Sequence, residues 1–369
     1  MSNRFRPAHR SIEGLVPYSG GKSMEELARE KGLSGIIKLA SNENPLGISP
    51  MAHEAARKAL EQVNRYPDGA SWALKEKLSH RLGVPREMIV VGNGSNEILE
   101  IMSQIFLSEG GQSLYAWPAF VVYRLAALAH GGEVMEVPLD GLLRHDLPAM
   151  ARAINPGTRI IFVANPNNPT GTIVTRDELE DFMERIPEGI PFVLDEAYYE
   201  FARHLPEFPD GIQYLREGKP VTVVRTFSKA YGLAGLRVGY AAVPEEIATL
   251  IERVRQPFNV NHVSQSAALA ALDDHEFVER TLEHNRVEME KIQAAVEGMG
   301  LSVTPSLTNF LLIDLARRNG EDVYNRLLDK GIIVRPMASY GLPGTIRVTP
   351  GLAWENDLFL EALEEILAG

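Results

Sequence analysis

The chain has 369 residues, of which 45% are hydrophobic and 23% are charged, and its formal net charge is −12. This length predicts one large domain with a smaller one beside it. The acidic balance disfavours a general surface for nucleic acid or anionic membranes. Because the sequence contains no cysteine, disulfides, thiolate nucleophiles and zinc–thiolate sites are excluded.

No targeting or anchoring segment is expected. No apolar run comes near the roughly 20 residues that a helix needs to span a bilayer. The basic residues Arg4, Arg6 and Arg10 are not followed by the apolar stretch of a signal peptide. The expected location is therefore the cytoplasm.

The first predicted strands and helices alternate along the chain. Short apolar runs predict strands over residues 88–91, 113–116, 160–164, 192–194, 221–225 and 238–242. Most of these runs are continuous rather than alternating, which is typical of strands covered on both faces. Helical patterns lie between them, for example over residues 97–107 and 176–185. This order predicts an α/β fold with a mostly parallel sheet sandwiched by helices.

The pattern changes after about residue 265. A long helix is predicted over residues 275–299, a strand over 310–314 and a helix over 321–330. Short strands follow over residues 332–335 and 345–348, and a last helix begins at Glu355. We therefore expect a large domain over residues 43–264. A small α+β domain is expected from residues 1–42 and 265–369.

The sequence predicts neither a nucleotide-binding loop nor a metal site. Residues 20–23, Gly-Gly-Lys-Ser, resemble the end of a Walker A loop, but Val16 stands where its first glycine is required. No strand precedes them, so a surface turn before a helix is the better interpretation. The nine histidines show no paired ligand spacing, and no metal site is expected.

Two loops follow predicted strands and could contact a ligand. The turn Gly-Asn-Gly-Ser-Asn-Glu at residues 92–97 lies between a strand and a helix, where backbone amides and the helix dipole favour a phosphate. Simple helix capping explains that turn equally well. The loop Asn-Pro-Asn-Asn-Pro-Thr-Gly at residues 165–171 also follows a buried strand. A turn does not require its two adjacent asparagines, and a side-chain amide at a strand end is well placed to contact a ligand.

Asp195, Tyr198 and Lys229 also follow buried strands. A carboxylate at the end of an apolar strand is costly to bury unless it is paired, so Asp195 either caps a helix or faces a cation. Tyr198 would add a phenolic donor beside it. Lys229 lies among hydroxyls and glycines, with no acidic residue near it in sequence. A lysine at a buried strand end is a candidate for a lowered pKa and for Schiff-base chemistry.

Together these motifs resemble those of the fold-type I pyridoxal-phosphate aminotransferases over essentially the whole chain. The shared order is Asn-Pro-Thr-Gly at 168–171, Asp-x-x-Tyr at 195–198 and Ser-Lys at 228–229, with Arg237 eight residues beyond the lysine. Other motifs are most similar to the histidinol-phosphate aminotransferase subfamily. These are Val-Pro-Tyr at 16–18, Leu-Ala-Ser-Asn-Glu-Asn-Pro-Leu-Gly at 39–47, Arg-Tyr-Pro-Asp at 65–68, Gln-Pro-Phe-Asn-Val-Asn at 256–261, Ile-Val-Arg-Pro at 333–336 and Ile-Arg-Val at 346–348.

The resemblance implies a role in cofactor binding for several residues. Lys229 would hold pyridoxal phosphate as a Schiff base and carry a proton to and from the substrate, and Asp195 would keep the pyridine nitrogen protonated. Asn168 and Tyr198 would hydrogen-bond the 3′ oxygen of the cofactor. Phe120 would stack on its ring, where many relatives have tyrosine. The phosphate would be held by Gly94, Ser95, Asn96, Thr226, Ser228 and Arg237.

The resemblance also implies a homodimer and a site for an anionic substrate. Tyr66 would reach the cofactor phosphate of the neighbouring subunit, although a rim aromatic packed beside Pro67 is the alternative. Arg335 and Arg347, with Tyr18 and Asn42, would bind the substrate. A phosphate dianion rewards two arginines, whereas one is enough for a carboxylate. Pro350 departs from the family, in which an aliphatic residue usually precedes Gly351.

The function implied is transfer of an amino group between L-histidinol phosphate and 2-oxoglutarate by a ping-pong mechanism, within histidine biosynthesis. The partners would be a small-molecule amino donor and a 2-oxo acid. An aromatic amino-acid aminotransferase is the first alternative, because related enzymes with the same arginine pair accept phenylalanine or tyrosine. A non-catalytic regulator that binds pyridoxal phosphate, and a decarboxylase on the same fold, are further alternatives.

Overall fold

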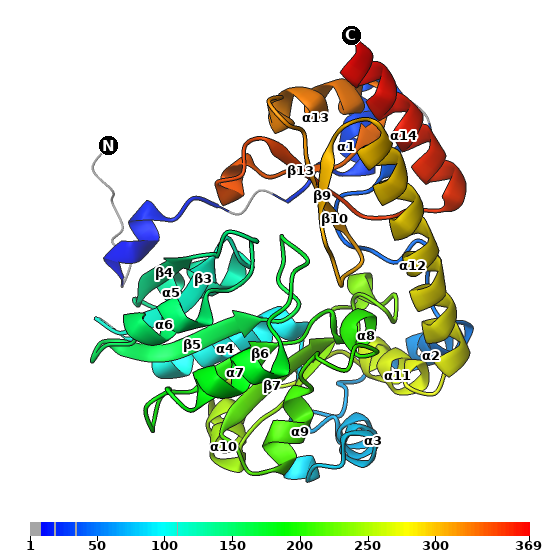
Figure 1. The fold of residues 1–369 in the computed structure, drawn as a ribbon. Helices are drawn as coiled ribbons and strands as arrows, with labels where there is room; N and C mark the ends of the chain where they lie inside the picture. Colours follow the sequence, from blue (N-terminus) through cyan, green and yellow to red (C-terminus); the bar gives the residue numbers. More distant parts are fainter. Residues whose placement is uncertain (1–8, 18–19, 34, 109) are drawn as a thin grey trace, which may run out of the picture.

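The computed structural model describes residues 9–17, 20–33, 35–108 and 110–369. A large domain fills the lower half of Figure 1 and a small domain the upper half, and the helix α12 (His275–Gly298) runs from one to the other. The 3-10 helix η1 (Arg10–Gly14) contacts the large domain, where the Ser11 hydroxyl donates to the Leu128 carbonyl at 2.6 Å. Within these ranges no helix combines the length and the apolar character needed to cross a membrane.

The large domain is built on a seven-stranded sheet of order β2-β8-β7-β6-β5-β3-β4. Only β8 runs antiparallel to its neighbours β7 and β2, while the remaining pairs are parallel. The strands are β2 (Ile89–Gly92), β3 (Gln112–Trp117), β4 (Glu133–Pro138), β5 (Thr158–Ala164), β6 (Phe192–Asp195), β7 (Val221–Thr226) and β8 (Gly239–Ala242).

Helices cover both faces of this sheet. Successive residues of a strand point to opposite faces, so Val91 joins one core and Val90 the other. The first core includes residues of α3 (Trp72–Leu82), α6 (Leu147–Ala153), α7 (Arg176–Met183), α9 (Gly211–Arg216) and α11 (His262–Ala271). The second includes residues of α4 (Ser95–Phe106), α5 (Val122–Ala129) and α10 (Glu245–Val254). Two further helices of this part of the chain are α2 (Pro50–Ala59) and α8 (Tyr199–Ala202).

The small domain packs helices on an antiparallel sheet of order β12-β13-β10-β9. Its strands are β9 (Ser302–Thr304), β10 (Leu311–Asp314), β12 (Arg335–Pro336) and β13 (Thr345–Val348), and its helices are α12, α13 (Gly320–Asp329) and α14 (Ala353–Ala368). The segment before residue 43 joins it, because β1 (Ile37–Lys38) pairs in parallel with β11 (Ile332–Ile333). Leu27 of α1 (Met24–Lys31) packs against Leu328 and Ile333.

The predicted α/β fold is confirmed, and the predicted strands agree with the observed ones to within two residues at each end, except over residues 332–335. Strands β1, β4 and β9 lie outside the predicted runs, and in β4 Glu133 and Glu136 interrupt the apolar pattern. The run predicted as one strand over residues 332–335 is wrong, since it forms β11 and β12 in two different sheets. The predicted domain boundary at 264/265 falls inside α11, whose Ala267 and Ala271 belong to a core of the large domain.

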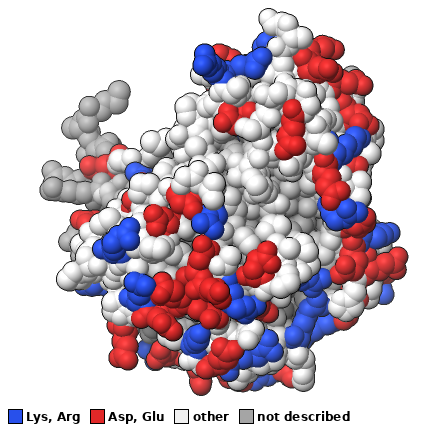
Figure 2. All heavy atoms as spheres, viewed as in Figure 1, with Lys and Arg blue, Asp and Glu red and all other residues white. Residues whose placement is uncertain are grey.

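The sheet brings the ends of several strands to one edge. Strands β5, β6 and β7 are parallel, so Ala164, Asp195 and Thr226 end on the same side. Strand β2 runs in the same direction, and α4 therefore begins at this edge too. The antiparallel strand β8 starts there, immediately after Arg237 and Val238. The loops at this edge face the small domain (Figure 1). On the side of the molecule drawn in Figure 2, acidic and basic side chains are interspersed over both domains.

Candidate active site

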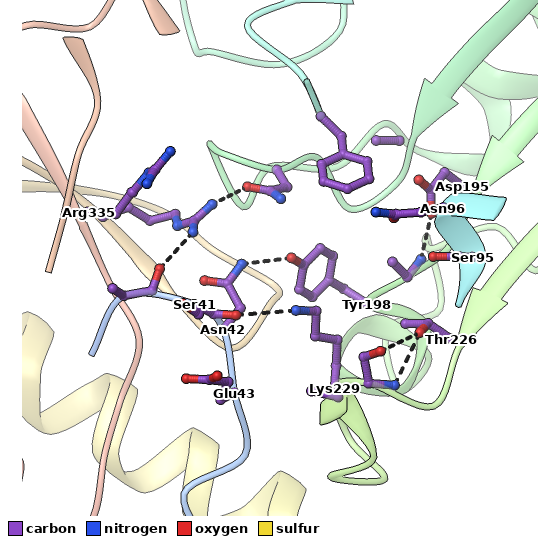
Figure 3. A pocket seen from close by; sticks show the side chains of 18 of the residues that line it. Ser41, Asn42, Glu43, Ser95, Asn96, Asp195, Tyr198, Thr226, Lys229 and Arg335 are labelled. Atoms are coloured by element: carbon purple, nitrogen blue, oxygen red, sulfur yellow. Dashed lines mark hydrogen bonds between the residues drawn. The ribbon is translucent and has the colours of Figure 1, made fainter. Parts of the chain in front are cut away.

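One cavity of about 390 Å³ lies between this edge of the sheet and the small domain. The large domain, the segment after β1 and the small domain all contribute to its wall. Figure 3 shows Asp195, Asn96, Ser95 and Thr226 on one side and Arg335 on the other, with Tyr198 and Lys229 between them. The predicted site residues that line the cavity are Asn42, Ser95, Asn96, Phe120, Asn168, Asp195, Tyr198, Thr226, Ser228, Lys229, Arg237, Arg335 and Arg347.

Among the described residues, two predicted site residues, Gly94 and Tyr66, do not line this cavity. Gly94 is the N-cap of α4, next to Ser95 of the cavity wall. Tyr66 is 83% exposed and stacks on Phe258, with ring centroids 4.7 Å apart. Tyr18 lies outside the described residues.

At one end of the cavity the groups present suit a phosphate. Helix α4 begins there, and its N-cap Gly94 has no side chain to bond the first amides. A Cβ on Gly94 would lie 2.6 Å from Nη2 of Arg237, so glycine is required for the guanidinium to lie against the helix terminus. The hydroxyls of Thr226 and Ser228 are 3.0 Å apart in the same wall. A helix terminus, an arginine and two hydroxyls form a donor set that fits a phosphate monoester.

Asp195 is the buried carboxylate of the site, with 3% of its surface exposed. Burial raises its pKa to about 6, against the opposing effect of two hydrogen bonds. The Tyr123 hydroxyl donates to Oδ2 at 2.8 Å, and the Ala197 amide donates to Oδ1 at 3.1 Å. A cationic partner in the cavity, such as a protonated ring nitrogen, would stabilise the ionised form of this buried carboxylate.

A second buried carboxylate fixes the strand ends behind the site. Glu196 receives two hydrogen bonds from Arg225, at 2.8 and 2.6 Å, and Arg225 also binds Asp210 at 2.7 Å. Burial raises the pKa of Glu196 to about 7, and Arg225 opposes that shift. In the chain, Glu196 directly follows Asp195 of β6, and Arg225 directly precedes Thr226 of β7. The ion pair therefore ties together the two strands that carry these residues.

Lys229 has the environment expected of a reactive amine. Burial, together with the nearby positive charges of Arg347 and Arg237, lowers its pKa to about 8, while Glu43 acts in the opposite direction. Its Nζ donates weakly to the Ser41 carbonyl at 3.4 Å (Figure 3). Near pH 8 the amine of Lys229 is therefore neutral in a larger fraction of the molecules than the amine of an ordinary surface lysine. A neutral amine is the nucleophile that Schiff-base chemistry requires.

Tyr198 and Asn168 lie between Lys229 and the small domain. Tyr198 is buried, which raises its pKa to about 12, while Arg347 and a hydrogen bond from Asn42 oppose that shift. The Asn42 amide donates to the Tyr198 hydroxyl at 2.7 Å. Asn168 accepts a short hydrogen bond from Nη1 of Arg347. The loop after β5 is thereby joined directly to the small domain.

Arg335 and Arg347 occupy directly opposite positions on the paired strands β12 and β13. Both line the cavity, and Arg347 is buried with its guanidinium 5.0 Å from the Phe310 ring. Nη2 of Arg347 donates to the Ala40 carbonyl at 3.0 Å. Like charges directly opposite one another destabilise a sheet, so this arrangement is best suited to an anion that lies between them.

Several residues in or beside the cavity were not predicted. Tyr123 is not part of the cavity wall, but its hydroxyl donates to Asp195 and so holds the carboxylate in place. Ser41 and Glu43 line the cavity beside Asn42, and Tyr340 lines it from the small domain while stacking on Trp117 at 5.5 Å. No local pattern marks Tyr340. The described residues contain no group of three or more His, Asp or Glu side chains able to hold a metal ion.

The sequence of the chain matches that of a known protein family over most of its length. The sequence pattern of the family described as aminotransferase class I and II matches residues 34–363. The chain belongs to this family. The predicted family resemblance is therefore confirmed.

Individual members of this aminotransferase family match the whole chain. Histidinol-phosphate aminotransferase 2 of Pseudomonas aeruginosa is 47% identical over 370 residues, which covers 100% of each chain. Histidinol-phosphate aminotransferase 1 of Nitrosococcus oceani is 44% identical and covers 98% of this chain and 97% of its own. Among solved structures, the histidinol-phosphate aminotransferase of Sinorhizobium meliloti, in complex with pyridoxal-5'-phosphate, superposes with a TM-score of 0.91. That enzyme is 29% identical, and the superposition covers 99% of this chain and 98% of the other.

Proposed function

We propose that this protein is a pyridoxal-phosphate-dependent aminotransferase of histidine biosynthesis, which moves an amino group between L-histidinol phosphate and 2-oxoglutarate by a ping-pong mechanism. The observation that carries the proposal is the arginine pair in the same cavity as the partly buried Lys229. The names of the relatives and the cofactor of the Sinorhizobium meliloti enzyme support it.

The residues of the cavity fit pyridoxal phosphate along its whole length. Arg237, Thr226, Ser228 and the start of α4 would hold its phosphate, and Phe120 would pack on its ring. When bound, the cofactor supplies an electron sink for the carbanion at the substrate Cα. The Asp195 carboxylate keeps a proton on the ring nitrogen.

Lys229 bonds the cofactor and moves a proton at the substrate Cα. Its pKa of about 8 allows Nζ to accept that proton and release it near neutral pH.

The arginine pair supports a phosphate rather than a carboxylate as the group that is bound. A phosphate dianion accepts charge-assisted hydrogen bonds from both Arg335 and Arg347, and it neutralises the repulsion between them. A carboxylate would accept its hydrogen bonds mainly from Arg347, and Arg335 would contribute less to its binding. Phenylalanine and tyrosine are therefore expected to be the poorer substrates.

Single substitutions test this proposal. Loss of one contact to a charged group costs about 1.5–3 kcal/mol, or roughly 10- to 150-fold in kcat/KM. Arg335→Leu should lose that much with histidinol phosphate and clearly less with phenylalanine, whereas Arg347→Leu should damage both reactions. Arg318→Leu, an exposed small-domain arginine outside the cavity, is the matched control and should change neither.

Other outcomes would select the alternatives. Equal losses with both substrates in Arg335→Leu would favour an aromatic amino-acid aminotransferase. Release of carbon dioxide from an amino-acid phosphate would indicate a decarboxylase. Cofactor binding without turnover of any amino donor would indicate a regulator.

The active unit that we propose is a homodimer with shared sites. Tyr66 and Phe258 form an exposed aromatic stack, and Leu60 and Val63 are exposed nearby in sequence. An apolar surface of this kind supports burial against a second subunit, from which Tyr66 would reach the partner's cofactor. Mixing the inactive variants Tyr66→Ala and Lys229→Ala should then restore activity through hybrid dimers. No recovery after demonstrated subunit exchange would contradict the shared site.

The cytoplasm stays the proposed location. Cell fractionation tests it, and recovery of the protein with membranes or outside the cell would contradict it.

A further inference from the structure

The carboxamide of Asn42 makes contacts that a substrate-binding residue does not need. We propose that Asn42 is a positioning residue that directs the Tyr198 hydroxyl toward the cofactor, and that it thereby connects the substrate-binding strand β13 to the cofactor. This inference rests on the proposed function, because it concerns the residue that would face the 3′ oxygen of the cofactor.

The direction of the Asn42–Tyr198 hydrogen bond follows from the other partners of Asn42. The Thr349 hydroxyl accepts from the Asn42 backbone amide at 2.9 Å, and it is 3.1 Å from Oδ1 of Asn42. A threonine hydroxyl that already accepts one hydrogen bond has its proton available to donate, and it donates here to Oδ1. The NH₂ end of the carboxamide is therefore left to face Tyr198, to which it donates at 2.7 Å (Figure 3).

The backbone of Asn42 is held as firmly as its side chain. Asn42 is 2% exposed and has a φ of 54°, in the left-handed region that asparagine tolerates better than most residues. Its carbonyl accepts from the Asn309 amide at 3.0 Å. Contacts from Asn309, Thr349 and Tyr198 thus fix one buried residue from three directions.

This arrangement determines where the Tyr198 proton points. Because the hydroxyl oxygen accepts from Asn42, its own hydrogen is directed elsewhere, and the cavity that Tyr198 lines is the open direction. Accepting a hydrogen bond also makes a phenol a stronger donor. The hydrogen bond from Asn42 accordingly opposes the rise in the pKa of Tyr198 that burial causes.

The same contacts connect the two halves of the site. Thr349 lies two residues after Arg347, at the end of β13, and it is itself buried. A shift of Arg347 on binding an anion would therefore be transmitted through Thr349 and Asn42 to the Tyr198 hydroxyl. Substrate binding and the electronic state of the cofactor would be coupled through this route.

The test is a double-mutant cycle on the reconstituted holoenzyme without substrate. The readout is the pH midpoint of the absorbance change of the bound cofactor. A donor to the 3′ oxygen lowers this midpoint, because it stabilises the negative charge on that oxygen. We expect Asn42→Gly, which keeps the left-handed backbone accessible, to raise the midpoint by about 0.5–1 pH unit, and Tyr198→Phe to raise it at least as far.

The decisive comparison is the double variant. If Asn42 acts through Tyr198, adding Asn42→Gly to Tyr198→Phe changes the midpoint no further. A full additional shift would overturn the proposal, since Asn42 would then act independently of the hydroxyl. An unchanged midpoint in Asn42→Gly, with a raised KM for histidinol phosphate, would also overturn it and would leave Asn42 as a substrate ligand.

Thr349 supplies a second and milder test should Asn42→Gly fail to fold. Thr349→Val keeps the shape but frees the carboxamide, so it should raise the midpoint, whereas Thr349→Ser retains the hydroxyl and should restore the parent value. Equal midpoints in both variants would contradict the proposal. A parent protein that shows no absorbance band of a bound cofactor would instead contradict the proposed function itself.

Discussion

The Asp195→Asn substitution should stabilise the cofactor-free protein while it inactivates the enzyme. Burial raises the pKa of this carboxyl from 3.8 to about 6. Each pKa unit corresponds to about 1.36 kcal/mol, so the buried charge costs about 3 kcal/mol of folding free energy when no cationic partner is bound. Asparagine keeps the shape and an acceptor for the Tyr123 hydroxyl or the Ala197 amide, without the charge.

The gain in stability should depend on pH with a definite sign. The pKa of Asp195 is higher in the folded protein than in the unfolded chain, so the folded protein binds its proton more tightly. The cost therefore grows as pH rises from about 4 to about 6 and is complete above that range. The variant should exceed the parent by about 3 kcal/mol at pH 8 and by roughly half of that at pH 5.

Urea unfolding of both proteins, stripped of cofactor, measures this difference at the two pH values. The exposed pair Asp181–Arg185 supplies the control, because Asp181→Asn removes only a solvent-screened ion pair and should leave stability nearly unchanged at both pH values. With cofactor bound, Asp195→Asn should lower kcat at least about 100-fold. A cofactor-free variant no more stable than the parent at pH 8 would refute the argument that Asp195 is kept for function at the expense of stability.

Two further substitutions test contacts that the structure shows. Tyr123→Phe removes a donor to the Asp195 carboxylate, so the pKa of Asp195 should rise, the acid limb of the pH–rate profile should move upward, and the rate at pH 7 should fall about 10-fold. An unchanged acid limb would show that Tyr123 is not needed there. Gly171→Ala places a Cβ 2.1 Å from Oγ of Ser306 at a φ of 79°, and it should lower the free energy of unfolding by about 1–3 kcal/mol in denaturant titrations. Unaltered stability would mean that the loop relaxes without cost.

The part of the site on the sheet could be predicted from the sequence. Asn168, Asp195 and Lys229 each follow an apolar run closely, and such runs predict parallel strands. Parallel strands end at one edge, so residues far apart in the chain are expected to meet there. The Gly94 turn was ambiguous alone, and the guanidinium of Arg237 against it supports the phosphate interpretation over simple capping.

Contacts between segments far apart in the chain could not be predicted in this way. The sequence predicts one strand over residues 332–335, but β11 pairs with β1 near the start of the chain, whereas β12 pairs with β13 in a different sheet. The partners of Asn42 are 156, 267 and 307 residues away along the chain. Such separations leave no periodic signal, because only the assembled fold brings these groups together.

Chemical trapping can determine directly whether Lys229 is the residue that bonds the cofactor. The protein is reconstituted with pyridoxal phosphate and reduced with borohydride, which makes the lysine–cofactor bond permanent, and its peptides are then mapped by mass spectrometry. We expect the cofactor mass on the peptide that contains Lys229 and on no other lysine. Labelling of a different lysine, or no labelling of the folded protein, would contradict it.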